Sequence, residues 1–175
     1  VPRGISLIEL RNLLGVELQY PIIAAHVNYK VENLNFLLYK PKDIEFLDAS
    51  SPTGMRVYVR TLNMVLACAI NELYPHTDLR IEHPISKGYY CTLQWNMDKN
   101  DDSMRQSPPA VTAEMVEAIK QRMLQIIKED RPIYEEEKRT KDVIKMFAAR
   151  YNNQGSIFET LGNPYCRYFR MGDFI

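Results

Sequence analysis

The first third of the chain alternates apolar and polar positions over short stretches. Leu7–Leu14 has the pattern of a short helix that begins at a capping box formed by Ser6 and Glu9 and ends at Gly15. Apolar runs separated by turn residues predict short strands at 22–27, 33–38 and 44–47. Residues 1–48 therefore read as a small α+β unit. Val1–Gly4 reads either as the tail of a strand whose start is missing or as the remainder of a protease site.

After residue 48 the pattern of apolar and polar positions predicts longer elements. Residues 49–54 are small or turn-forming and predict a linker, and the apolar spacing after them predicts a long helix over Met55–Leu73, stopped by Pro75. Further elements are expected along the rest of the chain: hairpin arms at Leu79–His83 and Tyr89–Trp95, a loop at 98–109, helices at Ala113–Glu129 and from Thr140, a capping box at 156–159 and a strand at Tyr165–Phe169. The charged run 135–139 reads as a solvated linker.

Composition narrows the class of protein. The chain has 175 residues, of which 46% are hydrophobic, and its 22 basic and 22 acidic residues give a formal net charge of +0. These values fit one medium or two small packed domains and argue against strong non-specific nucleic-acid binding, which requires an excess of cations. No apolar run approaches the roughly 18 residues of a membrane span. Three scattered cysteines favour a reduced, cytoplasmic protein.

Sequence motifs for catalysis are missing. The seven glycines form neither a P-loop nor a dinucleotide fingerprint, and the three histidines do not combine with the cysteines at zinc-ligand spacing. We therefore expect no catalytic residues, no metal and no cofactor in this chain itself. Cys68 and Cys91 are most simply small buried hydrophobes.

The order of elements resembles the front of threonyl-tRNA synthetase. Gly4–Leu7 and Ala25–Leu47 are similar to its TGS domain, a β-grasp module of ubiquitin-like fold. Ala67–Pro75 and the hairpin Ile81–Tyr90 are similar to the editing domain, also called the second additional domain. The resemblance implies an α+β chain with a TGS-like domain at 1–48, its first strand missing, and an editing-like domain at 55–175, truncated at its C-terminus.

A closer resemblance is to a group of multidomain bacterial uridine kinases, which place these two domains before a P-loop kinase domain. Asp48–Arg56 and Arg80–Cys91 carry this resemblance. It implies that the kinase domain lies beyond Ile175. ATP, Mg²⁺ and phosphotransferase activity would then belong to that missing domain, which would be the chain's natural partner.

The editing site of the synthetases departs from the family pattern here. Their HxxxH pair, two histidines one helical turn apart, is replaced by Arg60 and Met64, and their Cys-x-x-x-His segment would follow Asp173. An arginine stays protonated and offers no lone pair, so it is neither a base nor a metal ligand. Editing chemistry is therefore not expected from this chain.

Six residues remain as candidates for a ligand cleft: Arg60, Met64, Lys87, Tyr90, His83 and Asp173. The guanidinium of Arg60 is suited to bind a phosphate or a carboxylate. The alternative interpretation is that Arg60 forms a salt bridge. The resemblance implies that Lys87 and Tyr90 contact a nucleotide or another phosphate-bearing ligand. The alternative interpretation is that Lys87 is a turn residue and Tyr90 is packed in the fold. His83 is a structural hydrogen-bond donor or, less simply, a ligand.

Three functions follow from these residues. The first is a non-catalytic module that binds a ligand or partner and regulates an attached uridine kinase. The second is a diverged aminoacyl-tRNA editing deacylase, and the third is an RNA-binding module, for which Tyr165, Tyr168 and Phe169 offer base stacking or, more simply, core packing.

Overall fold

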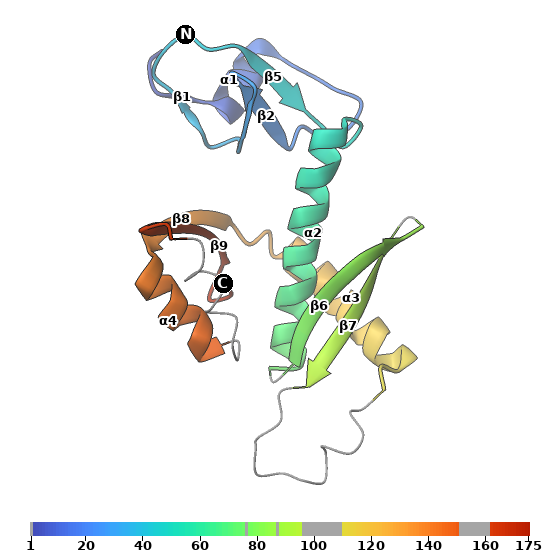
Figure 1. The fold of residues 1–175 in the computed structure, drawn as a ribbon. Helices are drawn as coiled ribbons and strands as arrows, with labels where there is room; N and C mark the ends of the chain where they lie inside the picture. The colour runs from blue at the N-terminus through green and yellow to red at the C-terminus, as the bar shows by residue number, and fades with distance from the viewer. Residues whose placement is uncertain (1, 76, 87, 96–109, 151–161) are drawn as a thin grey trace. The chain divides into compact units, whose positions relative to one another are not determined.

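The computed structural model describes the chain except for residues 1, 76, 87, 96–109 and 151–161 (Figure 1). It is an α+β fold whose contacts divide it into two units, Val1–Met64 and Val65–Ile175. The division falls within the longest helix, α2, which spans Pro52–Leu73. Among the described residues, no helix combines the length and the apolar character that crossing a bilayer requires.

The N-terminal unit is a short helix with five small strands. These elements are β1 (Ile5–Ser6), α1 (Leu7–Leu14), β2 (Ala24–Val27), β3 (Lys30–Glu32), β4 (Leu37–Leu38) and β5 (Ile44–Leu47). The antiparallel sheet has the order β3-β2-β5, and β1 pairs with β4. The core joins α1 to this sheet through buried side chains: Leu7, Leu10, Ala25, Val27 and Leu38.

The predicted start and end of α1 are confirmed. Glu9 Oε2 accepts a hydrogen bond from the Ser6 amide at 2.9 Å, and the Ser6 hydroxyl accepts one from the Glu9 amide at 3.2 Å. Gly15 ends the helix in the left-handed conformation at φ 59°. The run 33–38, in contrast, is not a single strand. Asn28 and Tyr29 both have positive φ, and this tight turn starts β3 at Lys30, before the expected position.

Asp48 and Gly54 form the entry to α2. The buried Asp48 carboxylate accepts hydrogen bonds from the Ser50 hydroxyl and amide and from the Tyr20 amide. These bonds, chiefly that of Ser50, hold the pKa of Asp48 below its usual value. A Cβ on Gly54 would lie 1.8 Å from the Asp48 carbonyl oxygen. The helix α2 begins at Pro52, three residues before the expected Met55, inside the segment predicted as a linker.

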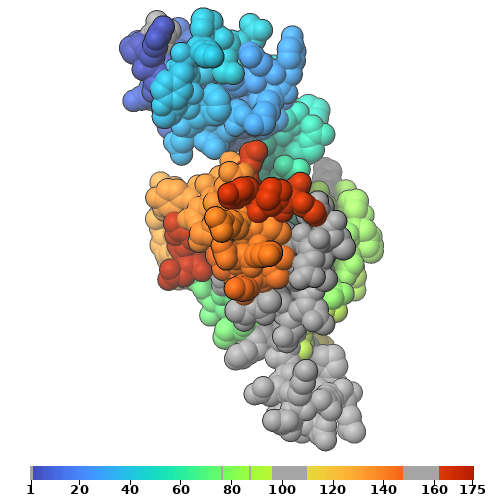
Figure 2. Space-filling view, turned by 60° about the vertical axis from the view of Figure 1, so that its left-hand side comes forward, coloured from blue at the N-terminus to red at the C-terminus, as the bar shows by residue number. Residues whose placement is uncertain are grey.

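The described part of the C-terminal unit contains two antiparallel strand pairs, the second half of α2 and two further helices. After the second half of α2 come β6 (Thr77–Ile85), β7 (Gly88–Trp95), α3 (Ala113–Lys128), β8 (Ile133–Arg139), α4 (Thr140–Arg150) and β9 (Tyr165–Met171). β6 pairs with β7, and β8 pairs with β9. In Figure 2 the atoms of α4 and of the β8–β9 strand pair, coloured orange to red, pack against one another. The predicted loop 98–109 and the capping box at 156–159 lie outside the described residues.

The charged run 135–139 is a strand, so its interpretation as a solvated linker was wrong. Its charges are matched by those of β9, with which it pairs antiparallel. Glu136 accepts hydrogen bonds from the Tyr168 hydroxyl at 2.5 Å and from Arg170 Nε at 2.7 Å, and Arg167 lies within 3.3 Å of Glu135 and 3.6 Å of Glu137. A charged sequence therefore forms β8 because its partner strand supplies the opposite charges.

The aromatic residues of β9 divide between its two faces. Tyr168 is buried beside Val143 of α4, which confirms the simpler interpretation of that residue as part of the core. Tyr165 and Phe169 are 55% and 57% exposed. Because strand residues alternate between faces, this separation follows from their register.

Candidate functional site

Arg60 and Met64 lie one turn apart on α2, so they share a face of the helix. Arg60 is exposed and forms no ion pair with any described residue of the N-terminal unit, so the salt-bridge interpretation finds no support there. Met64 is half-buried. The guanidinium of Arg60 can receive an anion, but neither side chain can take a proton from water or bind a hard metal ion at neutral pH.

Tyr90 and His83 meet on the β6–β7 hairpin. The register places two residues, Glu82 and His83, opposite the single residue Tyr90, between the pairs Ile81–Cys91 and Pro84–Tyr89. This β-bulge turns the His83 ring toward Tyr90. The two ring centroids are 5.4 Å apart with an interplanar angle of 33°. Two of the candidate residues thus form a contact that the sequence did not predict as a pair.

The surroundings of this pair are open. Tyr90 is 49% exposed, and Ile85 and Tyr89 near the end of the hairpin are similarly exposed. Cys91 is exposed as well, so its prediction as a buried hydrophobe was wrong, whereas Cys68 is fully buried as predicted. Tyr90 is accordingly not a packed core tyrosine.

Polar side chains flank the His83–Tyr90 pair. Thr92 Oγ1 donates to Glu82 Oε1 at 3.2 Å. Arg80 is exposed directly opposite Thr92, and Thr92 shares a face of β7 with Tyr90 because the two are separated by one residue. An exposed cation and an aromatic ring therefore lie on one face of the hairpin.

Lys87 and Asp173 are the two remaining candidates. Lys87 lies outside the described residues. Asp173 is exposed in the turn between Met171 and Phe174, which are joined by backbone hydrogen bonds of 2.8 and 3.0 Å. Among the described residues, no group of three or more histidine, cysteine or acidic side chains is arranged to hold a metal ion.

Sequence reasoning missed a charged cluster beside Cys68. Glu72 of α2 and Glu129 after α3 each contact both Arg122 and Arg131 at 2.5 to 3.0 Å. Glu72 Oε1 also lies 3.7 Å from the Cys68 thiol. Burial, with a further contribution from Glu72, raises the pKa of Cys68, so this thiol stays protonated and is a poor nucleophile.

Comparison with known proteins points to one class of enzyme. No protein-family model matches the chain. A threonine–tRNA ligase of Syntrophomonas wolfei is 30% identical over 149 residues, which cover 85% of this chain and 22% of that enzyme. The corresponding enzymes of Natranaerobius thermophilus and Clostridium kluyveri are 27% and 26% identical over the full chain and 26% of their own length.

The chain thus spans about a quarter of the length of the curated relatives it matches. These relatives support the resemblance to threonyl-tRNA synthetase and give no support to a uridine kinase as the parent protein. From end to end, the chain is similar to one segment of the threonine–tRNA ligases.

Proposed function

We propose that this chain is a non-catalytic module of threonyl-tRNA synthetase type that binds single-stranded RNA through its β6–β7 hairpin. The observation that carries the proposal is the exposed, ring-on-ring contact of His83 and Tyr90 at the bulge. The similarity to threonine–tRNA ligases, whose names include tRNA as a substrate, supports RNA as the class of ligand.

The chemistry of the hairpin suits unpaired bases. Every base offers a flat π face that can stack on an aromatic ring, and such stacking contributes about 1–3 kcal/mol per base. Arg80, on the same face as Tyr90, can contact a backbone phosphate. Because the chain has no net charge, we expect binding to depend on this local site rather than on long-range attraction.

The absence of catalysis is proposed from Arg60 and Met64. The resemblance aligns them with the histidines that the editing enzymes use, and neither can activate water. A retained scaffold with these two replacements is suited to binding an aminoacylated RNA end without hydrolysing its ester. The alternative, a working editing deacylase, requires a base that this face of α2 does not carry.

Binding can be tested with a short, unstructured, fluorescently labelled RNA and the full chain. We expect His83→Ala/Tyr90→Ala to weaken binding at least tenfold, which corresponds to about 1.4 kcal/mol. Tyr90→Phe should retain the wild-type affinity because the stacking ring remains. Tyr29→Ala, which removes a 93% exposed tyrosine from the N-terminal unit, is the matched control and should change nothing.

Equal affinities of wild type and the double variant would overturn the proposed site. The catalytic part is tested separately by incubating the chain with mischarged threonine tRNA. We expect release of the amino acid at the rate of buffer alone. Faster release that disappears in a Met64→Ala or Arg60→Ala variant would show that the deacylase alternative is correct.

A further inference from the structure

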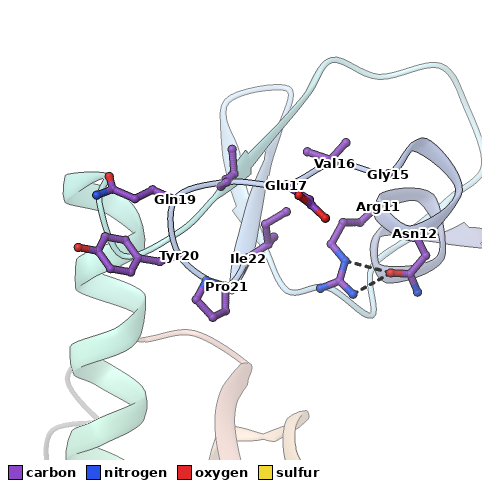
Figure 3. Close-up of a pocket in the computed structure, with 10 residues that line it drawn as sticks. Arg11, Asn12, Gly15, Val16, Glu17, Gln19, Tyr20, Pro21 and Ile22 are labelled. Carbon is purple, nitrogen blue, oxygen red and sulfur yellow. Dashed lines mark hydrogen bonds between the residues drawn. The ribbon is translucent and has the colours of Figure 1, made fainter.

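A hollow lies on the surface of the N-terminal unit, where α1 ends and the chain leads into β2 (Figure 3). Its volume is about 510 Å³, and its lining includes Arg11, Val16, Glu17, Tyr20 and Ile22. All of its lining residues belong to one unit, and none belongs to the hairpin proposed to bind RNA. We call this hollow the α1 groove.

Backbone contacts hold the walls of the α1 groove. Gly15, in the left-handed conformation, directs its amide to the Asn12 carbonyl at 3.3 Å, and the Val16 amide donates to the Arg11 carbonyl at 3.2 Å. At the other end the Tyr20 amide donates to the buried Asp48 carboxylate at 2.9 Å. The segment between α1 and β2 is therefore anchored at both of its ends.

Two opposite charges line the groove without pairing. Arg11 Nε and Nη2 donate to Asn12 Oδ1 at 3.1 and 2.7 Å, which leaves three of the five guanidinium N–H groups available. The Glu17 carboxylate is exposed and has no hydrogen-bond or ion-pair partner among the described residues. In Figure 3 the Glu17 side chain extends on the side of the loop that faces Arg11.

Apolar surface accompanies these charges. Ile22 is only 8% exposed and Val16 is half-buried, and Pro21 lies beside Ile22 in the lining. A ligand with one anionic group, one cationic group and a short hydrocarbon part would match all three features.

We propose that the α1 groove binds a free α-amino acid with an aliphatic side chain. Arg11 receives the carboxylate, Glu17 receives the ammonium group, and the side chain lies against Val16 and Ile22. The groove is open to solvent, so we expect an affinity on the order of 1 mM, which corresponds to about −4 kcal/mol. This site is independent of the RNA site, because it lies in the other unit.

The proposal predicts a charge-specific pattern in a titration of the full chain followed by ¹H–¹⁵N NMR. L-Leucine should shift the amides of Gly15, Glu17 and Gln19 in a saturable way. L-Leucinamide, which lacks the carboxylate, and N-acetyl-L-leucine, which lacks the ammonium group, should each bind roughly fivefold more weakly or worse.

Two variants test which charged side chain receives which charged group of the amino acid. Arg11→Gln should bind leucine and leucinamide equally, because it has lost only the partner of the carboxylate. Glu17→Gln should bind leucine and N-acetyl-leucine equally. Lys42→Gln, which removes an exposed cation of the same unit, is the control and should keep the wild-type preferences. The amide spectra of the variants show directly whether each remains folded.

Several results would overturn the proposal. They are the absence of saturable shifts at the groove amides with leucine, binding of either derivative to the wild-type chain as tightly as leucine, and tighter binding of a dipeptide than of the free amino acid. None of these results depends on whether the hairpin binds RNA.

Discussion

Arg131 and Glu72 are 59 positions apart in the sequence, yet Arg131 Nη1 donates a hydrogen bond to Glu72 Oε1 at 2.5 Å. Glu72 also accepts from Arg122 Nε at 2.6 Å, and both arginines contact Glu129. Two arginines and two glutamates thus form a closed ring. The ring connects the end of α2 to α3 and to the segment that enters β8.

Removing Glu72 is expected to destabilise the C-terminal unit. Glu72→Ala deletes hydrogen bonds to two charged partners and leaves one acid, Glu129, to contact both arginines of the ring, so we expect a loss of about 1–3 kcal/mol in the free energy of unfolding. Urea denaturation followed by circular dichroism measures it. The control is Glu117→Ala, which breaks only contacts within α3 and should have no measurable effect. Equal effects of the two variants would contradict the ring's role.

The same ring predicts a loss of stability in acid. Burial by itself raises the pKa of Glu72, but the hydrogen bonds from Arg131 and Arg122 outweigh it and hold the pKa below the ordinary value of 4.5. A carboxyl whose pKa is lowered by folding stabilises the fold fully above its unfolded pKa. That contribution is lost as the pH falls through the folded pKa. We therefore expect stability to decline below about pH 4.5.

The measurement is the urea midpoint of the wild type and of Glu72→Gln between about pH 3 and pH 7, a range chosen to bracket the carboxyl pKa values. The wild type should lose stability more steeply at the acidic end, because the variant has no carboxyl to protonate at this position. Parallel curves for the two proteins would show that Glu72 is not responsible. Asp48, whose pKa is also lowered, contributes in both proteins and cancels in the comparison.

Two equally buried threonines are expected to respond oppositely to the same substitution. Thr77 and Thr140 are each 8% exposed. The Thr77 hydroxyl has no hydrogen-bond partner among the described residues, whereas that of Thr140 donates to the Asn163 carbonyl and lies 3.3 Å from Cys166 Sγ. Thr140→Val should cost about 1–3 kcal/mol, and Thr77→Val should be neutral or stabilise by up to about 1 kcal/mol.

Thermal denaturation of both variants tests this contrast, and each serves as the control for the other. A Thr77→Val variant that is as destabilised as Thr140→Val would show that the Thr77 hydroxyl is hydrogen-bonded in solution. The small hollow of about 70 Å³ beside Thr77 would then be the place to look for its partner.

Gly54 is expected to tolerate no side chain. Because a Cβ would lie 1.8 Å from the Asp48 carbonyl oxygen, Gly54→Ala must move the start of α2 or the Asp48 loop. We expect a loss of about 2 kcal/mol or more, as for other overpacked positions. Met55→Ala, at the neighbouring exposed position, is the control and should be close to neutral. A stable Gly54→Ala protein with an unchanged amide spectrum would contradict the close approach.

Local sequence signals determined the helices well. The Ser6–Glu9 capping box and Gly15 act within one or two turns of α1, and the apolar spacing of α3 is a property of contiguous residues. Such signals need no distant partner, so they can be read from the chain alone. The α+β class and the similarity to threonyl-tRNA synthetase followed from the order of these elements.

What only the tertiary structure decided is which distant residues meet. The strand character of 135–139 depends on Arg167 and Arg170 of β9, and the His83–Tyr90 contact depends on a bulge that shifts the hairpin register. The α1 groove and the ring around Glu72 likewise join groups whose pairing no local pattern encodes. Charge matching, register and close backbone approach are properties of pairs in space, and a linear pattern of hydrophobic and polar residues does not specify them.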